Sequence, residues 1–414
     1  MENGINIQVV NTCKFKTICI AILLRQNLTK DTVTLNSVLS KILTLGTQKY
    51  KTIRDINIKT EQMYGTTIYS DVLKKGDNQI IEILIEFLND KVCLEEIFLF
   101  LKEILLNPLI ENNGFNKDFT QKAKNIVKEA ILTRQNDKKD FAKDRCIEIM
   151  CKNEGFGILG DGYLEDLEND KINEKNLYNH YQNILKTAPI DIFVIGDVKE
   201  ETIKDLTKKH LTITDRQYKP IKTDFVFKDQ TKPNTVVENF DITQGKLCMA
   251  YRTNIKADTP DFIPLLVANE ILGGGSGSML FNNVREKESL CYYINSFIFI
   301  FKGIVFIQSG VDFKSYEKAI KKISENVEMI KNDNFDENML QIAKTSLCKK
   351  YNSILDYNTS LIDYHYTNYL LGINMDIPSI IKNINKVTKN DVTNSFKNIW
   401  LDTCYFMKGD EIDR

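Results

Sequence analysis

Histidine is the scarcest reactive residue in this 414-residue sequence, with only three copies. They are His180, His210 and His365, so no two of them fall within one helical turn. A helical zinc site needs two imidazoles about four residues apart, on one face of the helix. We therefore expect no metal centre that is built from the histidines of this chain.

Cysteines do not take the place of the missing histidines. There are nine, scattered along the chain without a C-x-x-C pair, and Cys146 and Cys151 are the nearest two in its middle. Dispersed cysteines in odd number are typical of reduced thiols. The opening residues, Met1 to Gly4, are polar and show no apolar signal core. We therefore expect a cytoplasmic protein with free thiols and no metal of its own.

Charge of one sign and long apolar runs are also missing. The 55 basic and 56 acidic residues give a net charge of −1, which does not favour nucleic acid as a partner. The apolar run nearest the N-terminus, Ile18 to Leu24, is far shorter than the ~20 residues that a membrane-spanning helix needs. We expect no nucleic-acid partner and no membrane span.

Common catalytic motifs are absent as well. The sequence has no G-x-S-x-G elbow. The glycine run Gly273 to Ser278 follows an apolar helix and is not completed by Gly-Lys-Ser/Thr, so a phosphate loop is disfavoured. Cys291 could be a thiol nucleophile only if a histidine reached it in space, and no histidine is near it in the sequence.

The sequence does contain an internal repeat. Gly46 and Gly273 are 227 residues apart, and so are Gly76 and Gly303, each pair in the same context of strand or helix ends. One long period indicates two similar domains in tandem. We predict domains at 1–213 and 240–414, joined by a charged linker at 214–239. Each is expected to be α+β, with a mostly antiparallel sheet and helices packed on one face.

The stretch Leu272 to Tyr293 has the most distinctive chemistry. Glycines such as Gly273, Gly274 and Gly275 allow positive φ and close approach of another chain. The guanidinium of Arg285 suits carbonyl oxygens, and the Tyr292 hydroxyl can stabilise an oxyanion. Two structural alternatives stay open: a helix cap followed by an ordinary helix, or Arg285 paired with a nearby acid such as Glu288 while Tyr292 lies in the core.

The same stretch resembles a family signature. Leu-Gly-Gly-Gly-x-x-Ser-x-Leu-Phe-x-x-Val-Arg-Glu-Lys-x-x-Leu-x-Tyr, here Leu272 to Tyr292, is similar to the second-domain motif of the pitrilysin/insulinase metallopeptidases. That family carries an inverted zinc motif, H-x-x-E-H, on the first helix of its first domain, shortly before Gly-Thr. Gly46-Thr47 matches this ending, and the motif positions fall on Ser37, Ser40 and Lys41.

The departure at these positions removes the ligands that the resemblance implies. Serine hydroxyls do not replace imidazoles, and a lysine ammonium repels a dication. The third ligand of the family would fall at Glu129 or Ala130, and one carboxylate could not hold zinc alone. We therefore expect no zinc in this chain and no hydrolytic activity of the chain by itself.

Paired chains of this family commonly divide the work between two subunits. The resemblance implies a heterodimer in which a homologous zinc-bearing subunit cleaves a peptide, while this chain supplies Arg285 and Tyr292 and lines the substrate path with Gly273 to Gly275. The alternative is a catalytically dead structural or peptide-binding protein of the same fold. Segments including Tyr251 to Thr253 are also similar to a bacterial insulinase-like branch associated with 5-aminopentanol modification of elongation factor P.

Overall fold

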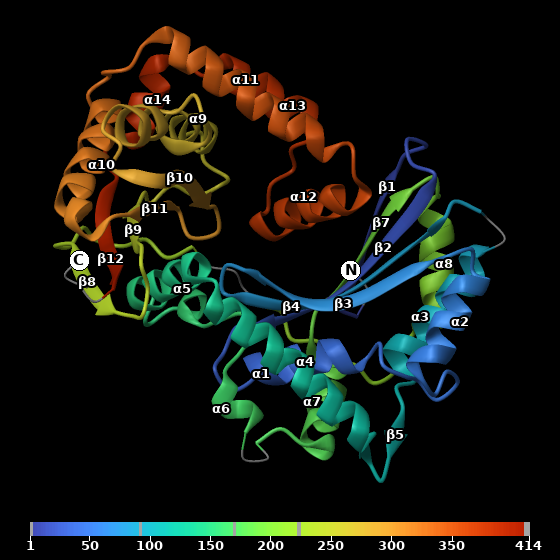
Figure 1. Cartoon of the computed structure of the whole chain (residues 1–414). Coiled ribbons are helices and arrows are strands. Elements are labelled where there is room, and N and C mark those ends of the chain that lie inside the picture. The colour runs from blue at the N-terminus through green and yellow to red at the C-terminus, as the bar shows by residue number, and fades with distance from the viewer. Residues whose placement is uncertain (1–2, 91–92, 169–170, 222–224, 410–414) are drawn as a thin grey trace. The chain divides into compact units, whose positions relative to one another are not determined.

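A computed structural model describes residues 3–90, 93–168, 171–221 and 225–409 of the chain (Figure 1). Contacts divide it into two compact units. The first comprises Met1–Thr133, Ile158–Thr223 and Tyr357–Tyr366, and the second comprises Arg134–Gly157, Asp224–Asp356 and Thr367–Arg414. Each unit therefore contains one short segment from the opposite half of the sequence.

The first unit is built on a five-stranded sheet. Its order is β1 (Ile5–Asn11), β7 (Ile190–Gly196), β2 (Thr17–Asn27), β4 (Asn78–Leu88) and β3 (Thr67–Lys75). Only the outer pair β1 and β7 is parallel, and the other three pairings are antiparallel. The central strand β2 is apolar on both faces because both faces are covered.

Helices form a layer on one face of this sheet. Side chains of β2 such as Ile20 and Ile22 share one core with Leu39, Phe98 and Leu177 of three of these helices. The helices are α1 (Val33–Ile42), α2 (Ile53–Gln62), α3 (Cys93–Leu106), α4 (Lys117–Asn136), α6 (Leu164–Leu167), α7 (Glu174–Thr187) and α8 (Glu200–His210), and a short hairpin of β5 (Ile110–Glu111) and β6 (Gly114–Phe115) precedes α4.

The first half of α12 (Asn358–Leu371) covers the other face of the first sheet. Asn358 donates hydrogen bonds to Thr17 and Glu86, and Tyr366 packs edge-on against Phe193. This contact explains why residues 357–366 belong to the first unit although they lie late in the sequence.

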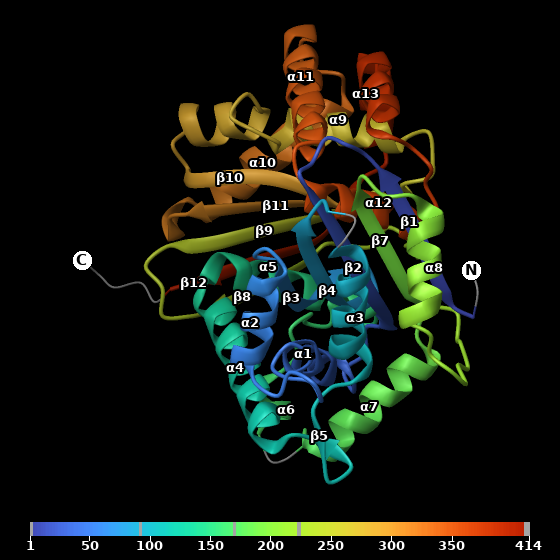
Figure 2. The ribbon, with the colours of Figure 1, turned by 90° about the vertical axis from the view of Figure 1, so that its right-hand side faces the viewer.

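The second unit repeats the arrangement, as Figure 2 shows from the side. Its sheet has the order β10 (Cys291–Phe299), β11 (Ile304–Val311), β9 (Gly245–Arg252), β12 (Trp400–Lys408) and β8 (Asn234–Asn239), with only β12 and β8 parallel. One face carries the helices α9 (Phe262–Gly273), α10 (Tyr316–Lys331), α11 (Glu337–Ile354), α13 (Ile377–Lys386) and α14 (Lys389–Phe396). On the other face, Ala142 and Cys146 of α5 (Lys138–Met150) pack against Cys248 and Tyr405.

The α+β class and the tandem sheets are as the sequence predicts, with differences at the sheet edges. The sequence does not reveal β1 or β8. β8 occupies the end of the predicted linker 214–239, in which residues 222–224 lie outside the described residues. The helix α5 also gives the second sheet cover on a second face. No helix in the described parts of the chain is both long and apolar enough to cross a membrane.

Candidate functional site

Arg285 lies on a π-helix, Phe281–Lys287, between the glycine turn and β10. Its guanidinium carbon is 4.8 Å from the centroid of the Phe281 ring, and its Nε is 3.7 Å from Glu286 Oε1. The side chain remains 41% exposed. Arg285 therefore does pair with a nearby acid, but that acid is Glu286; Glu288 pairs instead with Lys318 and Lys322 at 2.8 and 3.4 Å. Single π-helical turns occur often at functional sites.

Tyr292 sits on a β-bulge at the start of β10. Cys291 pairs with Val311 and Tyr293 pairs with Gly310, so Tyr292 is an extra residue in the ladder. A bulge re-aims the side chain of the inserted residue, and Tyr292 is 61% exposed. Its hydroxyl donates a hydrogen bond of 3.3 Å to Asp312 Oδ1. The alternative that Tyr292 belongs to the core is therefore wrong.

Arg285 and Tyr292 thus share one segment and one property. Both are presented by backbone irregularities, and both keep solvent access. No direct hydrogen bond joins them within the described residues; Arg285 stacks on Phe281, and Tyr292 is hydrogen-bonded to Asp312. These two partners were not identified from the sequence, since neither has a motif that links it to Arg285 or Tyr292.

The three glycines serve different purposes. A Cβ on Gly273 would lie 2.6 Å from Ser296 Oγ, and a Cβ on Gly274 would overlap the Glu270 carboxylate. Gly275 is exposed and would meet only Glu270, at 3.9 Å. None of the three has positive φ, so Gly273 and Gly274 serve close packing rather than left-handed backbone. Of the three, Gly275 alone leaves open space for another chain.

A buried acid holds the glycine turn in place. Glu270, in the last turn of α9, accepts from Lys350 Nζ at 2.6 and 2.8 Å and from Ser346 Oγ at 2.7 Å. Lys350 also donates to the carbonyl of Gly274 at 2.8 Å. A charged residue in an otherwise apolar helix end is the sequence signal that could have indicated this anchor.

The positions of the degenerate zinc motif are filled by side chains with other partners. Ser37 Oγ donates to the Val33 carbonyl at 3.1 Å, and Ser40 Oγ donates to the Ser37 carbonyl at 2.8 Å. Lys41 Nζ forms an ion pair of 2.7 Å with Asp71. Two buried hydroxyls and a paired ammonium do not provide the donors that zinc requires.

The position of the third ligand gives no support to a metal either. Glu129 and Ala130 are both exposed on α4, whereas their neighbours Val127 and Ile131 face the core. Among the residues that the structure describes, no group of three or more His, Cys, Asp or Glu side chains could hold a metal ion. The residues present therefore do not fit the zinc of the family.

The three histidines have partners within the fold, and Cys291 lacks the properties of a nucleophile. His180 Nε2 lies 2.7 Å from Asn36 Oδ1, and burial lowers the pKa of this imidazole to about 4. His210 lies 3.2 Å from Glu95, and the ring of His365 packs against that of Tyr364. Burial raises the pKa of the Cys291 thiol, which is the opposite of what a thiol nucleophile needs.

Comparison with known proteins shows the family to which this chain belongs. Residues 171–347 match the family model "Peptidase M16 inactive domain". The "Probable inactive metalloprotease YmfF" of Bacillus subtilis (strain 168) is 31% identical over 416 residues, which cover 99% of this chain and 97% of that protein. The crystal structure of a conserved protein from Enterococcus faecalis V583 superposes with a TM-score of 0.93 at 27% identity, covering 100% of this chain and 99% of the other.

A more distant structure shows the same fold. The peptidase M16 inactive domain from Pseudomonas fluorescens has a TM-score of 0.80 at 14% identity and covers 99% of this chain and 97% of its own. The chain therefore belongs to the peptidase M16 family. Within that family it is an inactive metalloprotease homologue, which is consistent with the serines and the lysine at the zinc-motif positions.

Proposed function

We propose that this chain is the metal-free subunit of a two-chain zinc peptidase of the insulinase/pitrilysin type. A homologous partner subunit with an intact H-x-x-E-H motif would bind zinc and activate water. This chain would supply Arg285 to a substrate carbonyl and Tyr292 to the oxyanion that forms on hydrolysis. The exposed backbone at Gly275 would adjoin the peptide.

The contrast between the two units is the observation that carries this proposal. On α1 the ligand positions have been replaced and their side chains are used internally. In the second unit, Arg285 and Tyr292 are both present and exposed. Tyr292 sits on a β-bulge, where it is left out of the pairing between β10 and β11. An exposed tyrosine on an irregular strand end has little value for stability, which favours a contact with something else.

The alternative is a structural or peptide-binding protein without a catalytic role. The internal hydrogen bond of Tyr292 to Asp312 is compatible with it. The two functions differ in their dependence on Arg285 and Tyr292. A structural role requires the surface of the chain but not these two side chains.

A reconstitution assay separates the two functions. The chain, a candidate partner with H-x-x-E-H, and their mixture are assayed against a library of quenched fluorescent peptides. We expect zinc-dependent cleavage by the mixture only. Arg285→Ala is the test variant, and Lys287→Ala on the same π-helix is its control. Zinc-dependent cleavage by the lone chain, or equal activity of the partner with and without this chain, would refute the proposal.

Two finer assignments come from the sequence rather than from the geometry of the site. We propose a cytoplasmic location, which the scattered free cysteines favour. We also propose that the peptidase pair belongs with the machinery that attaches 5-aminopentanol to elongation factor P. Loss of the modified form of that factor in a deletion strain, measured by mass spectrometry of the intact protein, is the expected result.

A further inference from the structure

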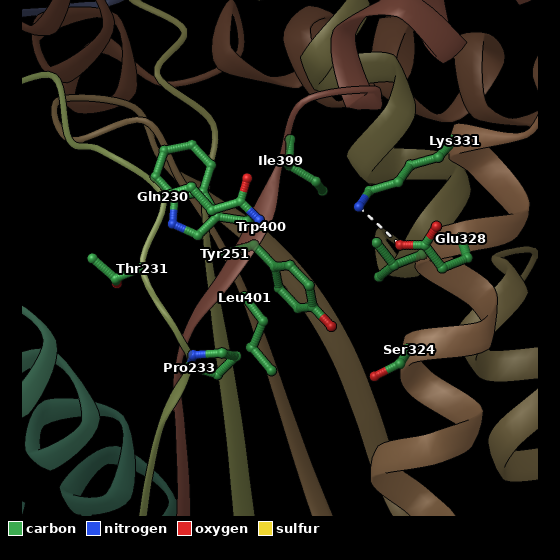
Figure 3. Close-up of a pocket in the computed structure, with 11 residues that line it drawn as sticks. Gln230, Thr231, Pro233, Tyr251, Ser324, Glu328, Lys331, Ile399, Trp400 and Leu401 are labelled. Carbon is green, nitrogen blue, oxygen red and sulfur yellow. Dashed lines mark hydrogen bonds and ion pairs between the residues drawn. The ribbon is translucent and has the colours of Figure 1, made fainter.

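A cavity of about 220 Å³ lies at the edge of the second sheet, away from any residue assigned a role above (Figure 3). It is lined by the extended segment before β8, by the start of β12, by Tyr251 of β9 and by one face of α10. Its origin is in the sheet register. β8 begins opposite Thr403, whereas β12 begins three residues earlier at Trp400, so the first residues of β12 pair with β9 on one side and have no strand beside them on the β8 side.

The indole of Trp400 contains an unpaired donor at this cavity. Trp400 is only 8% exposed, and its Nε1 is buried without a hydrogen-bond partner within the described residues. A buried donor without a partner destabilises the folded state and calls for an explanation. Gln230, an exposed side chain on a segment without regular structure, lines the same cavity (Figure 3). A ligand carbonyl that reaches Nε1 would satisfy this donor.

Hydroxyl groups lie on the opposite side of the cavity. The ring of Tyr251 points toward α10, and its hydroxyl lies on the same side of the cavity as the hydroxyl of Ser324 (Figure 3). Hydroxyls can accept as well as donate. The cavity therefore offers a donor at one end, acceptors at the other, and the apolar side chains of Val327, Ile399 and Leu401 between them.

The two charged residues that line the cavity, Glu328 and Lys331, neutralise each other. Glu328 and Lys331 form an ion pair of 2.8 Å across one wall, so neither is available to a charged ligand without breaking the pair. The volume is below the roughly 300–1,000 Å³ of pockets for drug-sized molecules. These features favour a small, uncharged ligand of about a dozen heavy atoms.

We propose that this cavity binds an uncharged amide with a branched aliphatic side chain, the size of one capped amino-acid residue. Its carbonyl accepts from Trp400 Nε1, its N–H donates to the hydroxyls of Tyr251 and Ser324, and its side chain fills the apolar middle. The assignment stands on these contacts and does not depend on the proposed peptidase role.

The single tryptophan of the chain allows a direct test. With ¹⁵N-labelled tryptophan the full chain gives one indole N–H resonance, which is titrated with N-acetyl-leucinamide. We expect a saturable downfield shift with a Kd on the order of 1 mM. N-acetyl-leucine, an anion, and leucinamide, a cation, share the side chain and are expected to bind at least ~10-fold more weakly.

Variants locate the site. Ser324→Leu places an apolar side chain in the cavity and should abolish the shift, whereas Lys321→Leu on the exposed face of the same helix should not change it. An indole resonance that stays fixed at about 10 mM N-acetyl-leucinamide in the wild type overturns the proposal. Equal shifts with all three probes, or an unaltered shift in Ser324→Leu, also overturn it.

Discussion

Replacing Lys302 with methionine should destabilise the second unit strongly, because it removes one member of a buried ion cluster. The carboxylate of Glu154, 7% exposed, lies 2.6 Å from Lys302 Nζ and 3.0 Å from Arg252 Nη2. Lys302 and Arg252 are 4% and 2% exposed. Asp402 contacts Arg252 at 3.2 Å from the other side.

The magnitude follows from the burial of these groups. Removing one partner of a buried ion pair typically costs 3–5 kcal/mol, because the other charge stays buried with less compensation. Lys228, a half-exposed third cation at 3.1 Å from Glu154, should compensate for part of the loss. We therefore expect Lys302→Met to lower the free energy of unfolding by about 3 kcal/mol. Lys256, an exposed lysine paired with Asp258, provides the control, and Lys256→Met should change it by less than about 0.5 kcal/mol.

Urea unfolding monitored by tryptophan fluorescence is a suitable assay. Trp400 is the sole tryptophan and pairs with Arg252 in the sheet, so its signal reports the unit that contains the cluster. A midpoint shift without a change in slope indicates a stability effect. A loss below about 1 kcal/mol for Lys302→Met, or equal losses for both lysine variants, would show that the cluster contributes no net stability.

Three further predictions concern pH and the glycine turn. Burial raises the pKa of Glu154, but the Lys302 hydrogen bond and the Arg252 charge outweigh it and lower the pKa to about 2. The stability that this carboxylate contributes is therefore present above pH ~4.5 and is lost as the pH falls toward 2. Glu154→Gln should make the free energy of unfolding less dependent on pH in that window, measured by Trp400 fluorescence. Burial, aided by the charge of Asp363, raises the pKa of Glu82 to about 7, so its ionisation costs stability as the pH rises from ~4.5 to 7. Glu82→Gln should therefore stabilise the protein by about 2 kcal/mol at pH 8 and by little at pH 4, measured by urea unfolding followed by far-UV circular dichroism. The same stabilisation at both pH values would contradict this prediction. Gly274→Ala should lower the free energy of unfolding by about 1–3 kcal/mol, because the added methyl overlaps the Glu270 carboxylate. Gly275→Ala should leave it nearly unchanged in the same assay, and equal losses of stability in the two variants would contradict the role of Gly274 in packing.

The repeat in the sequence predicted the tandem sheets because equivalent positions carry equivalent physical constraints. Lys124 and Lys344 illustrate this in the structure. Each is buried on a long helix and donates to a backbone carbonyl, of Ile172 or Asn385. They lie 220 residues apart, the same offset as Phe115 and Phe335. Local pattern and repeat together therefore fixed most helices and the antiparallel strands.

The parts that could not be predicted depend on non-local pairing. β1 and β8 are edge strands with mixed polar and apolar residues, and each is held by a parallel partner that is far away in sequence. The helix α5 covers the second sheet although it precedes that sheet by about a hundred residues. Nothing in the local periodicity of these segments specifies which sheet they join.

The candidate site shows the same division. The motif identified Arg285, Tyr292 and the glycines, but their roles depended on geometry. The π-helix, the bulge at Tyr292 and the Glu270–Lys350 anchor required coordinates. At the degenerate motif, the prediction depends on residue chemistry rather than on geometry, because serine hydroxyls and a lysine ammonium are not the ligands that zinc prefers.

The central proposal is that Tyr292 acts on a substrate held by another subunit. The most direct measurement is kcat and KM of the reconstituted pair with Tyr292→Phe in this chain, beside Tyr357→Phe, which alters an equally exposed tyrosine. We predict that Tyr292→Phe lowers kcat by roughly 10²-fold, as expected for a lost oxyanion donor, with KM nearly unchanged. Equal kcat values for Tyr292→Phe, Tyr357→Phe and the wild type would contradict the proposal.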